Sequence, residues 1–179
     1  RSMRRVDNPP NPFSLTRVEL DLEAAPAELE IYEERAKSAL SQNDSPDIPF
    51  KYSVNAYRGC FHACAYCYAR PSHQYWGFGA GTDFERKLIV KTNVAGKLRE
   101  ELARKSWRGE PITFSGNTDC YQPIEANYRL TRACLEVCLE HRNPASVITK
   151  GAVLLRRDLD LLEALAREAQ LAVYVSIPF

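Results

Sequence analysis

The sequence lacks several features that would place it in a specialised class of protein. Its longest apolar run, residues 171–179, is interrupted by Ser176 and is far shorter than the roughly 20 residues that span a bilayer. We therefore expect no membrane partner. The first ten residues are basic and then proline-rich, so no export signal is visible and a cytoplasmic location is expected. Methionine occurs once, as Met3, and residue 1 is arginine, which fits either a vector-derived start or an internal fragment.

A large excess of either charge is also missing. The chain carries 24 basic and 23 acidic residues, which gives a formal net charge of +1. Proteins that track nucleic-acid phosphates usually have a basic excess, so the charge does not support nucleic acid as a partner, although it does not exclude one. Hydrophobic residues make up 45% of the 179 residues, enough for one domain with a substantial core.

The six cysteines are not spread as a disulfide framework would be. Three of them fall in the segment CFHACAYC, with the spacing Cys60-x3-Cys64-x2-Cys67. A structural zinc site needs four protein ligands, so zinc would need His62 or Cys120 as the fourth. A four-iron cluster held by three thiolates would instead leave one iron open for another ligand. The spacing alone leaves both kinds of site open.

The N-terminal part of the chain, residues 1–49, reads as an irregular leader that contains one helix. The segment 26–43 has Pro26 near its start, acidic residues in its first half and basic residues later, which suits the helix dipole. The turn residues and prolines of NDSPDIP then end this helix.

The rest of the chain, residues 50–179, alternates between strand and helix patterns. Short apolar runs predict strands, and apolar positions three or four apart predict helices. The strands are expected at 51–57, 111–116, 145–151 and 171–179, and the helices at 93–105, 128–142 and 158–169. This order predicts an α/β core, β(αβ)₃, whose parallel strands are covered on both faces.

Such units build either a doubly wound sheet or a barrel, and their active sites lie at the carboxyl ends of the strands. The cysteine segment follows the first predicted strand, and SGNTDC follows the second. Both segments are therefore expected at the same edge of the sheet. The chain stops on what reads as an inner strand, so we expect these residues to be the first part of a longer protein.

Three longer stretches carry a resemblance to a known superfamily. They are NDSPDIPFKYSVNAYRGCFHACAYCYARPSHQYWGFGAGTDFE, GNTDCYQPIEANYRLTR and VITKGAVLLRRDLDLL. Together with the cysteine spacing and the aromatic residue before the last cysteine, they resemble the radical S-adenosylmethionine (radical SAM) enzymes, in a subfamily related to spore photoproduct lyase. The likeness covers residues 43–179. The chain departs from the family pattern at Ala56 (usually proline), Phe61 (glutamate), Ala63 (glycine) and Cys120 (proline).

The resemblance implies a fold, two cofactors and an activity. The fold would be a partial (β/α) barrel, and the cofactors would be a [4Fe-4S] cluster and S-adenosylmethionine. The reduced cluster would cleave S-adenosylmethionine to a 5′-deoxyadenosyl radical, which abstracts hydrogen from a substrate that the sequence does not name. The electron would come from a donor such as flavodoxin or ferredoxin. The alternative is a non-catalytic zinc or iron–sulfur protein whose cysteine site is structural.

The resemblance also assigns the site residues. Cys60, Cys64 and Cys67 would hold the cluster, and the cofactor-binding residues would be Tyr66, beside the adenine, with Asn117, Thr118, Asp119, Thr149, Lys150 and Ser176. The carboxylate of Asp119 could accept hydrogen bonds from the cationic ammonium of S-adenosylmethionine. Cys120 could donate a hydrogen atom to a product radical or simply fill space. Cys134 and Cys138 lie four apart on an apolar helix face, which favours core packing over a second metal site.

Overall fold

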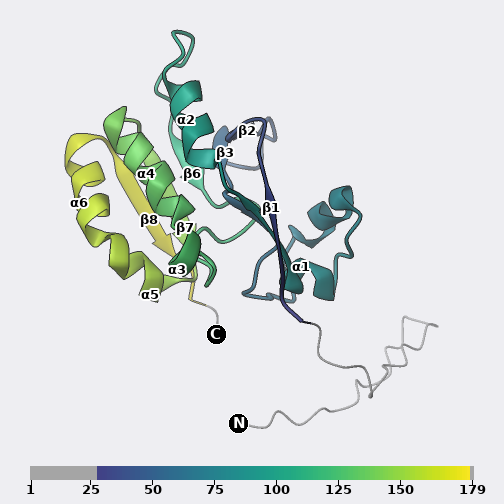
Figure 1. Cartoon of the computed structure of the whole chain (residues 1–179). Helices are drawn as coiled ribbons and strands as arrows, with labels where there is room; N and C mark the ends of the chain where they lie inside the picture. Colours follow the sequence, from purple (N-terminus) through teal and green to yellow (C-terminus); the bar gives the residue numbers. More distant parts are fainter. Residues whose placement is uncertain (1–27, 178–179) are drawn as a thin grey trace, which may run out of the picture.

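The computed structural model describes residues 28–177, whose strands form two sheets (Figure 1). One sheet has the order β2 (Leu40–Gln42), β3 (Tyr52–Val54), β6 (Ile112–Phe114), β7 (Ala145–Thr149) and β8 (Leu171–Val175). The other has the order β1 (Glu30–Glu34), β5 (Lys87–Lys91) and β4 (Tyr57–Arg58). Strands β3, β6, β7 and β8 are mutually parallel, whereas β2 pairs antiparallel with β3.

Three longer helices lie side by side on one face of the five-stranded sheet (Figure 1). They are α2 (Val94–Leu102), α4 (Leu130–Glu140) and α6 (Leu159–Glu168). The shorter elements are α1 (Thr82–Arg86), α3 (Glu125–Tyr128), α5 (Ala152–Leu155) and the 3₁₀ helices η1 (Arg70–Trp76) and η2 (Arg156–Asp158). Over residues 28–177, no helix combines the length and the apolar character that a membrane crossing requires.

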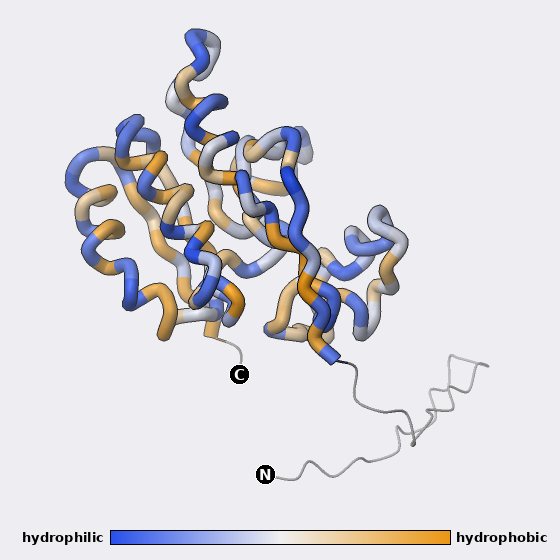
Figure 2. The backbone as a smooth tube through the Cα atoms, in the orientation of Figure 1, coloured by the Kyte–Doolittle hydropathy of each residue, from blue (hydrophilic) through white to orange (hydrophobic). Residues whose placement is uncertain are grey.

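The core lies between the sheet and these helices. Ile112 and Phe114 of β6 pack there with Leu98, Leu135 and Leu165, which come from α2, α4 and α6 and are fully buried. Figure 2 shows the hydrophobic stretches gathered where helices meet strands. Burying each such side chain contributes about 1.5–3 kcal/mol to folding, so this layer is the main source of stability.

The predicted α/β order of the core is confirmed. Each of the three predicted helices and four predicted strands has a counterpart, with ends shifted by a few residues, and β3, β6, β7 and β8 are parallel as expected. The last two residues of the predicted strand 171–179 lie outside the described part of the chain. Between the predicted strand 51–57 and the predicted helix 93–105, the structure also contains η1, α1 and β5.

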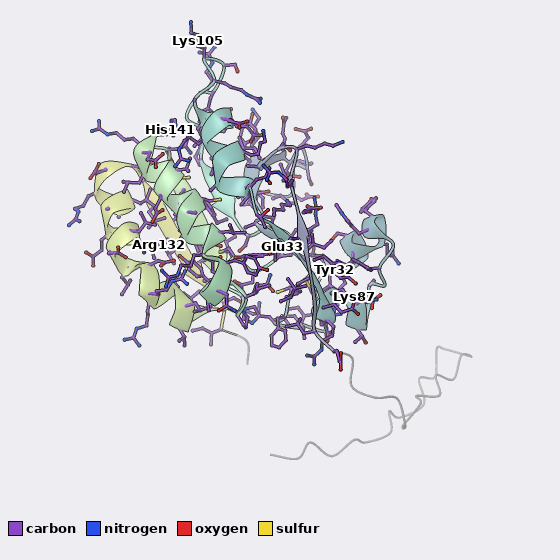
Figure 3. All side chains as sticks on the ribbon, viewed as in Figure 1. Tyr32, Glu33, Lys87, Lys105, Arg132 and His141 are labelled. Carbon is purple, nitrogen blue, oxygen red and sulfur yellow. The ribbon has the colours of Figure 1, made fainter. Side chains whose placement is uncertain are left out.

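The helix predicted for residues 26–43 is wrong within the described residues, because strands β1 and β2 occupy it. Strand β1 pairs along its whole length with β5, from Glu30 opposite Lys87 to Glu34 opposite Lys91. Figure 3 labels side chains along this pair, including Glu33 and Lys87. Helix propensity is a weak preference that tertiary pairing overrides, and here a partner strand distant in sequence supplies the hydrogen bonds. The first 27 residues of the predicted leader lie outside the described part.

The prediction that the parallel strands are covered on both faces is also wrong for the last two of them. Along β7, buried residues alternate with more exposed ones, and Ile148 retains 38% of its surface. Strand β8 is mostly exposed, with Tyr174 at 59% and Val175 at 44%. The helices cover one face only, so a continuous apolar run in these strands does not mean burial on both sides.

Candidate functional site

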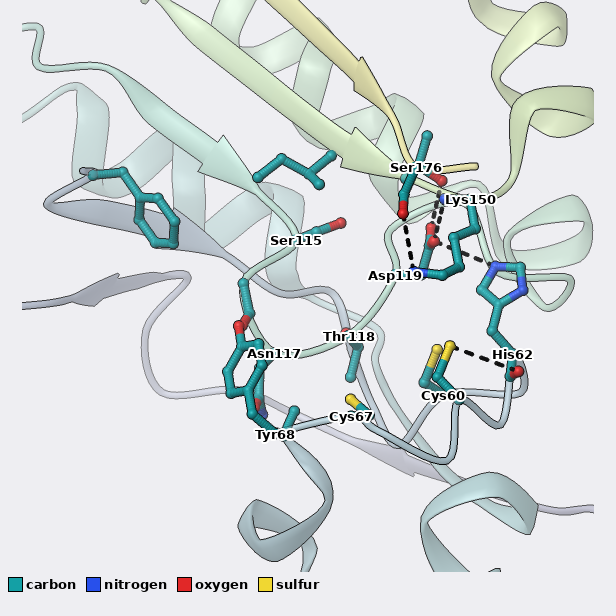
Figure 4. A pocket seen from close by; sticks show the side chains of 16 residues that line it. Cys60, His62, Cys67, Tyr68, Ser115, Asn117, Thr118, Asp119, Lys150 and Ser176 are labelled. Carbon is teal, nitrogen blue, oxygen red and sulfur yellow. Dashed lines mark hydrogen bonds and ion pairs between the residues drawn. The ribbon is translucent and has the colours of Figure 1, made fainter. Parts of the chain in front are cut away.

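A cavity of about 300 Å³ opens at the carboxyl ends of the parallel strands (Figure 4). Its lining includes all three cysteines of the CFHACAYC segment. It also includes six of the seven predicted cofactor-binding residues: Asn117, Thr118, Asp119, Thr149, Lys150 and Ser176. The cavity therefore gathers residues from five separate stretches of the chain, and four of these stretches follow the parallel strands, as expected for the carboxyl edge of such a sheet.

The cysteine loop begins in a tight approach to α1 and β5. Gly59 has a φ of +74°, and a Cβ atom there would lie 2.9 Å from the backbone oxygens of Phe84 and Lys87, so only glycine fits. The next residue, Cys60, donates its backbone N–H to Phe84 O at 2.8 Å. Burial raises the pKa of the Cys60 thiol to about 11, so binding a metal there has to displace a proton.

Gln122 holds the cysteine loop from the other side. Its side chain is fully buried, its Oε1 accepts a hydrogen bond from Phe61 N at 2.9 Å, and its Nε2 donates to Gly59 O at 3.2 Å. The loop after β6 thereby fixes the backbone on both sides of Cys60. Sequence reasoning missed this residue, although it lies in the GNTDCYQPIEANYRLTR stretch, because a lone glutamine carries no signal of a backbone contact.

Ala63, between the first two cysteines, has a φ of +55°. This left-handed conformation costs a residue with a Cβ atom about 1–2 kcal/mol, and the family pattern has glycine here. Substitution of Ala63 by glycine is therefore expected to raise the free energy of unfolding by about 0.5–1 kcal/mol, measured by urea denaturation.

Gly77 provides the matched control for this prediction. Its φ is +75°, and a Cβ atom there would meet nothing within 4 Å, so only the backbone conformation resists a side chain. The change Gly77→Ala should lower the free energy of unfolding by about 1 kcal/mol. If A63G is less stable than the natural chain, the turn at Ala63 is not strained.

Asp119 links the loop after β6 to the end of β7. Its Oδ1 accepts hydrogen bonds from Thr149 Oγ1 at 2.5 Å and Tyr121 N at 2.9 Å, and its Oδ2 accepts one from Lys150 N at 2.6 Å. Burial alone would raise the pKa of Asp119, but these donors and the nearby His62 hold the pKa below its ordinary value. Both carboxylate oxygens of Asp119 therefore already accept hydrogen bonds from the protein. Few acceptor positions remain on them for the ammonium of a ligand.

His62 places a buried ring nitrogen at the cavity wall, next to Asp119. Its Nε2 atom is buried and lies 3.3 Å from Asp119 Oδ2, but it makes no hydrogen bond with the residues that the structure describes. No three His, Cys, Asp or Glu side chains within residues 28–177 are close enough together to share one metal ion. In a [4Fe-4S] cluster each thiolate binds a different iron, so the three sulfur atoms need not converge on one point. A single zinc ion needs all its ligands around one point, so the loop would have to rearrange to bind zinc.

Asn117 and Thr118 are held by the surrounding backbone and side chains. Asn117 Nδ2 donates to Ser72 Oγ at 3.0 Å, and Thr118 Oγ1 donates to Tyr57 O at 3.0 Å. The Oδ1 atom of Asn55 accepts the backbone N–H groups of both residues, at 3.0 and 3.3 Å. The loop after β6 thus has a well-defined conformation facing the cysteines.

Lys150, Ser176 and Tyr66 form the outer rim. Lys150 Nζ donates to Ser176 Oγ at 3.3 Å and lies 5.7 Å from the centre of the Tyr66 ring. Tyr66 is 72% exposed and is not part of the cavity lining. The structure therefore brings Lys150 and Ser176 into the cavity and leaves Tyr66 beside its mouth.

The other cysteines belong to the core. Cys120 is 4% exposed, is absent from the cavity lining, and its Sγ lies 3.9 Å from Ile148 O. Burial raises its pKa. Of the two roles considered for Cys120, filling space fits this placement. The core packing predicted for Cys134 and Cys138 is confirmed, since both are fully buried on α4.

Fold and cavity together define an α/β chain with a thiol-lined cavity at the carboxyl edge of parallel strands. Comparison with known proteins finds relatives described only as uncharacterized. One from Mycobacterium tuberculosis is 46% identical over 147 residues, covering 82% of this chain and 43% of the relative. One from Methanocaldococcus jannaschii is 33% identical over 137 residues (76% and 48%), and one from Acidianus two-tailed virus is 28% identical over 132 residues (70% and 42%).

This chain therefore spans less than half the length of the curated relatives it matches. No family model matches the sequence. No solved structure matches it either.

Proposed function

We propose that this chain is a radical S-adenosylmethionine enzyme, or the N-terminal portion of one, that carries a [4Fe-4S] cluster on Cys60, Cys64 and Cys67. One observation carries the proposal: these three thiols line a single cavity at the carboxyl edge of the parallel strands. Polar groups at the ends of β6 and β7 line the same cavity, where such folds hold their ligands.

The donor set in the cavity fits a three-thiolate cluster better than a closed zinc site. The cavity lining contains three cysteines, and the remaining nearby cysteine, Cys120, lies outside it. A structural zinc site needs a fourth protein ligand, and His62 faces Asp119 instead. A four-iron cluster with three protein thiolates keeps one iron for an outside ligand.

The strand order supports a partial barrel over a doubly wound sheet. Strands β3, β6, β7 and β8 follow one another in space in the order of the chain, without a reversal. Helices α2, α4 and α6 lie on one face, whereas a doubly wound sheet carries helices on both faces. We propose that the exposed edge at β8 accepts further strands in the longer relatives.

The chain's own residues would bind and orient the cofactors. When bound, the cluster and S-adenosylmethionine supply one-electron cleavage to a 5′-deoxyadenosyl radical. Asp119 holds the loop after β6 against the end of β7, which positions Asn117 and Thr118 toward the cysteines. Lys150 places a positive charge at the rim, suited to the carboxylate of S-adenosylmethionine.

Anaerobic reconstitution with iron and sulfide, followed by dithionite and S-adenosylmethionine, tests this function. The expected result is a brown protein with about four iron and four sulfide per chain that releases 5′-deoxyadenosine and methionine. A colourless protein with one zinc and no 5′-deoxyadenosine would support the structural-site alternative and overturn the proposal. If the protein binds the cluster but releases no 5′-deoxyadenosine, the assignment of the cluster ligands stands. The claim that this chain alone is catalytic is then overturned.

A further inference from the structure

A second cavity, of about 260 Å³, adjoins the cysteine cavity. The two cavities share Phe50, Tyr68, Gly116 and Asn117 in their linings. The second lies where the two sheets meet, and most of its lining comes from residues 41–58 together with Lys91 of β5. A group bound there would therefore be next to the proposed cofactor site.

Lys91 is the unusual residue of this second cavity. It is the last residue of β5, its side chain lines the cavity, and it is only 5% exposed. No hydrogen bond or ion pair joins its ammonium to another residue in the range 28–177, and the ammonium is not sealed inside the protein, so it faces the cavity. An ammonium that is largely enclosed, faces a cavity and lacks a protein partner is suited to pair with an anionic ligand that enters the cavity.

The charges around Lys91 leave a positive excess. Arg58 of β4 also lines the cavity, is paired through Nε with Glu34 Oε1 at 3.2 Å, and stacks on Trp76 with its guanidinium 3.6 Å from the ring centre. Two cations thus face one carboxylate. Burial and then Arg58 lower the pKa of Lys91 to about 8, while Glu34 of β1 and Cys134 of α4 oppose that shift.

Neutral donors complete the cavity wall. Asn55 uses its Oδ1 to accept two backbone N–H groups, which leaves its amide nitrogen free to donate. Ser53 is 7% exposed and also lines the cavity. Cations combined with amide and hydroxyl donors are the groups that recognise a phosphate.

We propose that Lys91 and Arg58 bind a phosphate group of the substrate in this second cavity. Phosphate binding in the second cavity does not depend on the proposed function. Only the statement that the phosphate belongs to the substrate rests on that function. The cavity accommodates the phosphate of a small molecule, and its position presents the rest of that molecule to the cysteine cavity through the shared wall.

Titration of the protein with inorganic phosphate tests the proposal. With ¹³C-labelled lysine, NMR follows the pKa of Lys91, which is expected to rise by about one unit when phosphate binds, since a nearby anion favours the charged form. The change Lys91→Met should weaken phosphate binding at least about tenfold, whereas Lys91→Arg should keep most of it.

Lys87→Met is the matched control, because Lys87 lies on the same strand but pairs with Asp83 at 3.2 Å and is absent from the second cavity. It should leave phosphate binding unchanged. The proposal is overturned if phosphate does not shift the Lys91 signal, if K87M weakens binding as much as K91M, or if acetate binds and phosphate does not. The titration needs neither cluster nor S-adenosylmethionine, so its outcome is separate from that of the 5′-deoxyadenosine assay.

Discussion

Alanine in place of Cys60, Cys64 or Cys67 is expected to reduce the iron held after anaerobic reconstitution from about four atoms per chain to nearly none. The reason is that each thiolate would hold a different iron, so the loss of one corner exposes the cluster to solvent and exchange. The measurement is iron and sulfide content, together with the visible absorption of the cluster. Formation of 5′-deoxyadenosine should be lost with it.

Cys138→Ala is the control for these variants. Cys138 is fully buried on α4 and takes no part in the cavity, so this change should leave the iron content unaltered. Cys120→Ala distinguishes the two kinds of site, because Cys120 is one candidate for the fourth ligand of a zinc ion. Loss of metal in C120A would contradict a three-thiolate cluster.

The second large effect concerns stability and comes from the buried Asp158. Its Oδ1 accepts hydrogen bonds from Arg132 Nη1 at 3.0 Å and Arg157 Nε at 2.9 Å, and its Oδ2 accepts one from Tyr121 Oη at 3.1 Å. Arg157 also pairs with the buried Glu125 at 3.2 Å. Removing one charge from such a network leaves its partners uncompensated, so Asp158→Asn should lower the free energy of unfolding by about 3 kcal/mol at pH 7.

The pH dependence of this effect has a definite sign. Burial alone would raise the pKa of Asp158, but Arg157 and Arg132 hold the pKa below its ordinary value. The stabilisation is therefore complete above the pKa of the unfolded chain, about 4, and is lost as pH falls through the lower folded value. Urea denaturation across this range should show D158N approaching the natural chain in acid.

Asp160 supplies the control, since it also pairs with Arg132, at 2.9 Å, but is exposed. Asp160→Asn should change stability much less than D158N, because solvent screens an exposed ion pair. Equal losses in D158N and D160N would show that burial of the network is not what stabilises it.

Local pattern accounts for the parts of the fold that were predicted correctly. The apolar spacing of residues 128–142 and 158–169 predicted α4 and α6. One face of each helix is buried, and this produces apolar residues three or four positions apart in the local sequence. The spacing of Cys60, Cys64 and Cys67 likewise places three thiols in one short loop whatever surrounds it. The loop after β6 was expected beside them because parallel strands end at a common edge, and the cavity lining bears this out.

Long-range pairing decided the rest. Residues 30–34 form a strand because β5, more than 50 positions away in the sequence, supplies their hydrogen bonds. The residues next to 30–34 in the sequence do not indicate that this partner strand exists. The clamp by Gln122 and the isolated charge of Lys91 arise in the same way, since each depends on which distant segments meet. The sequence by itself determined the alternation of parallel strands and longer helices from β3 to β8 and the thiol loop, because these follow from patterns among neighbouring residues. Only the tertiary structure decided what each polar side chain faces, because burial and contact are properties of the packed chain.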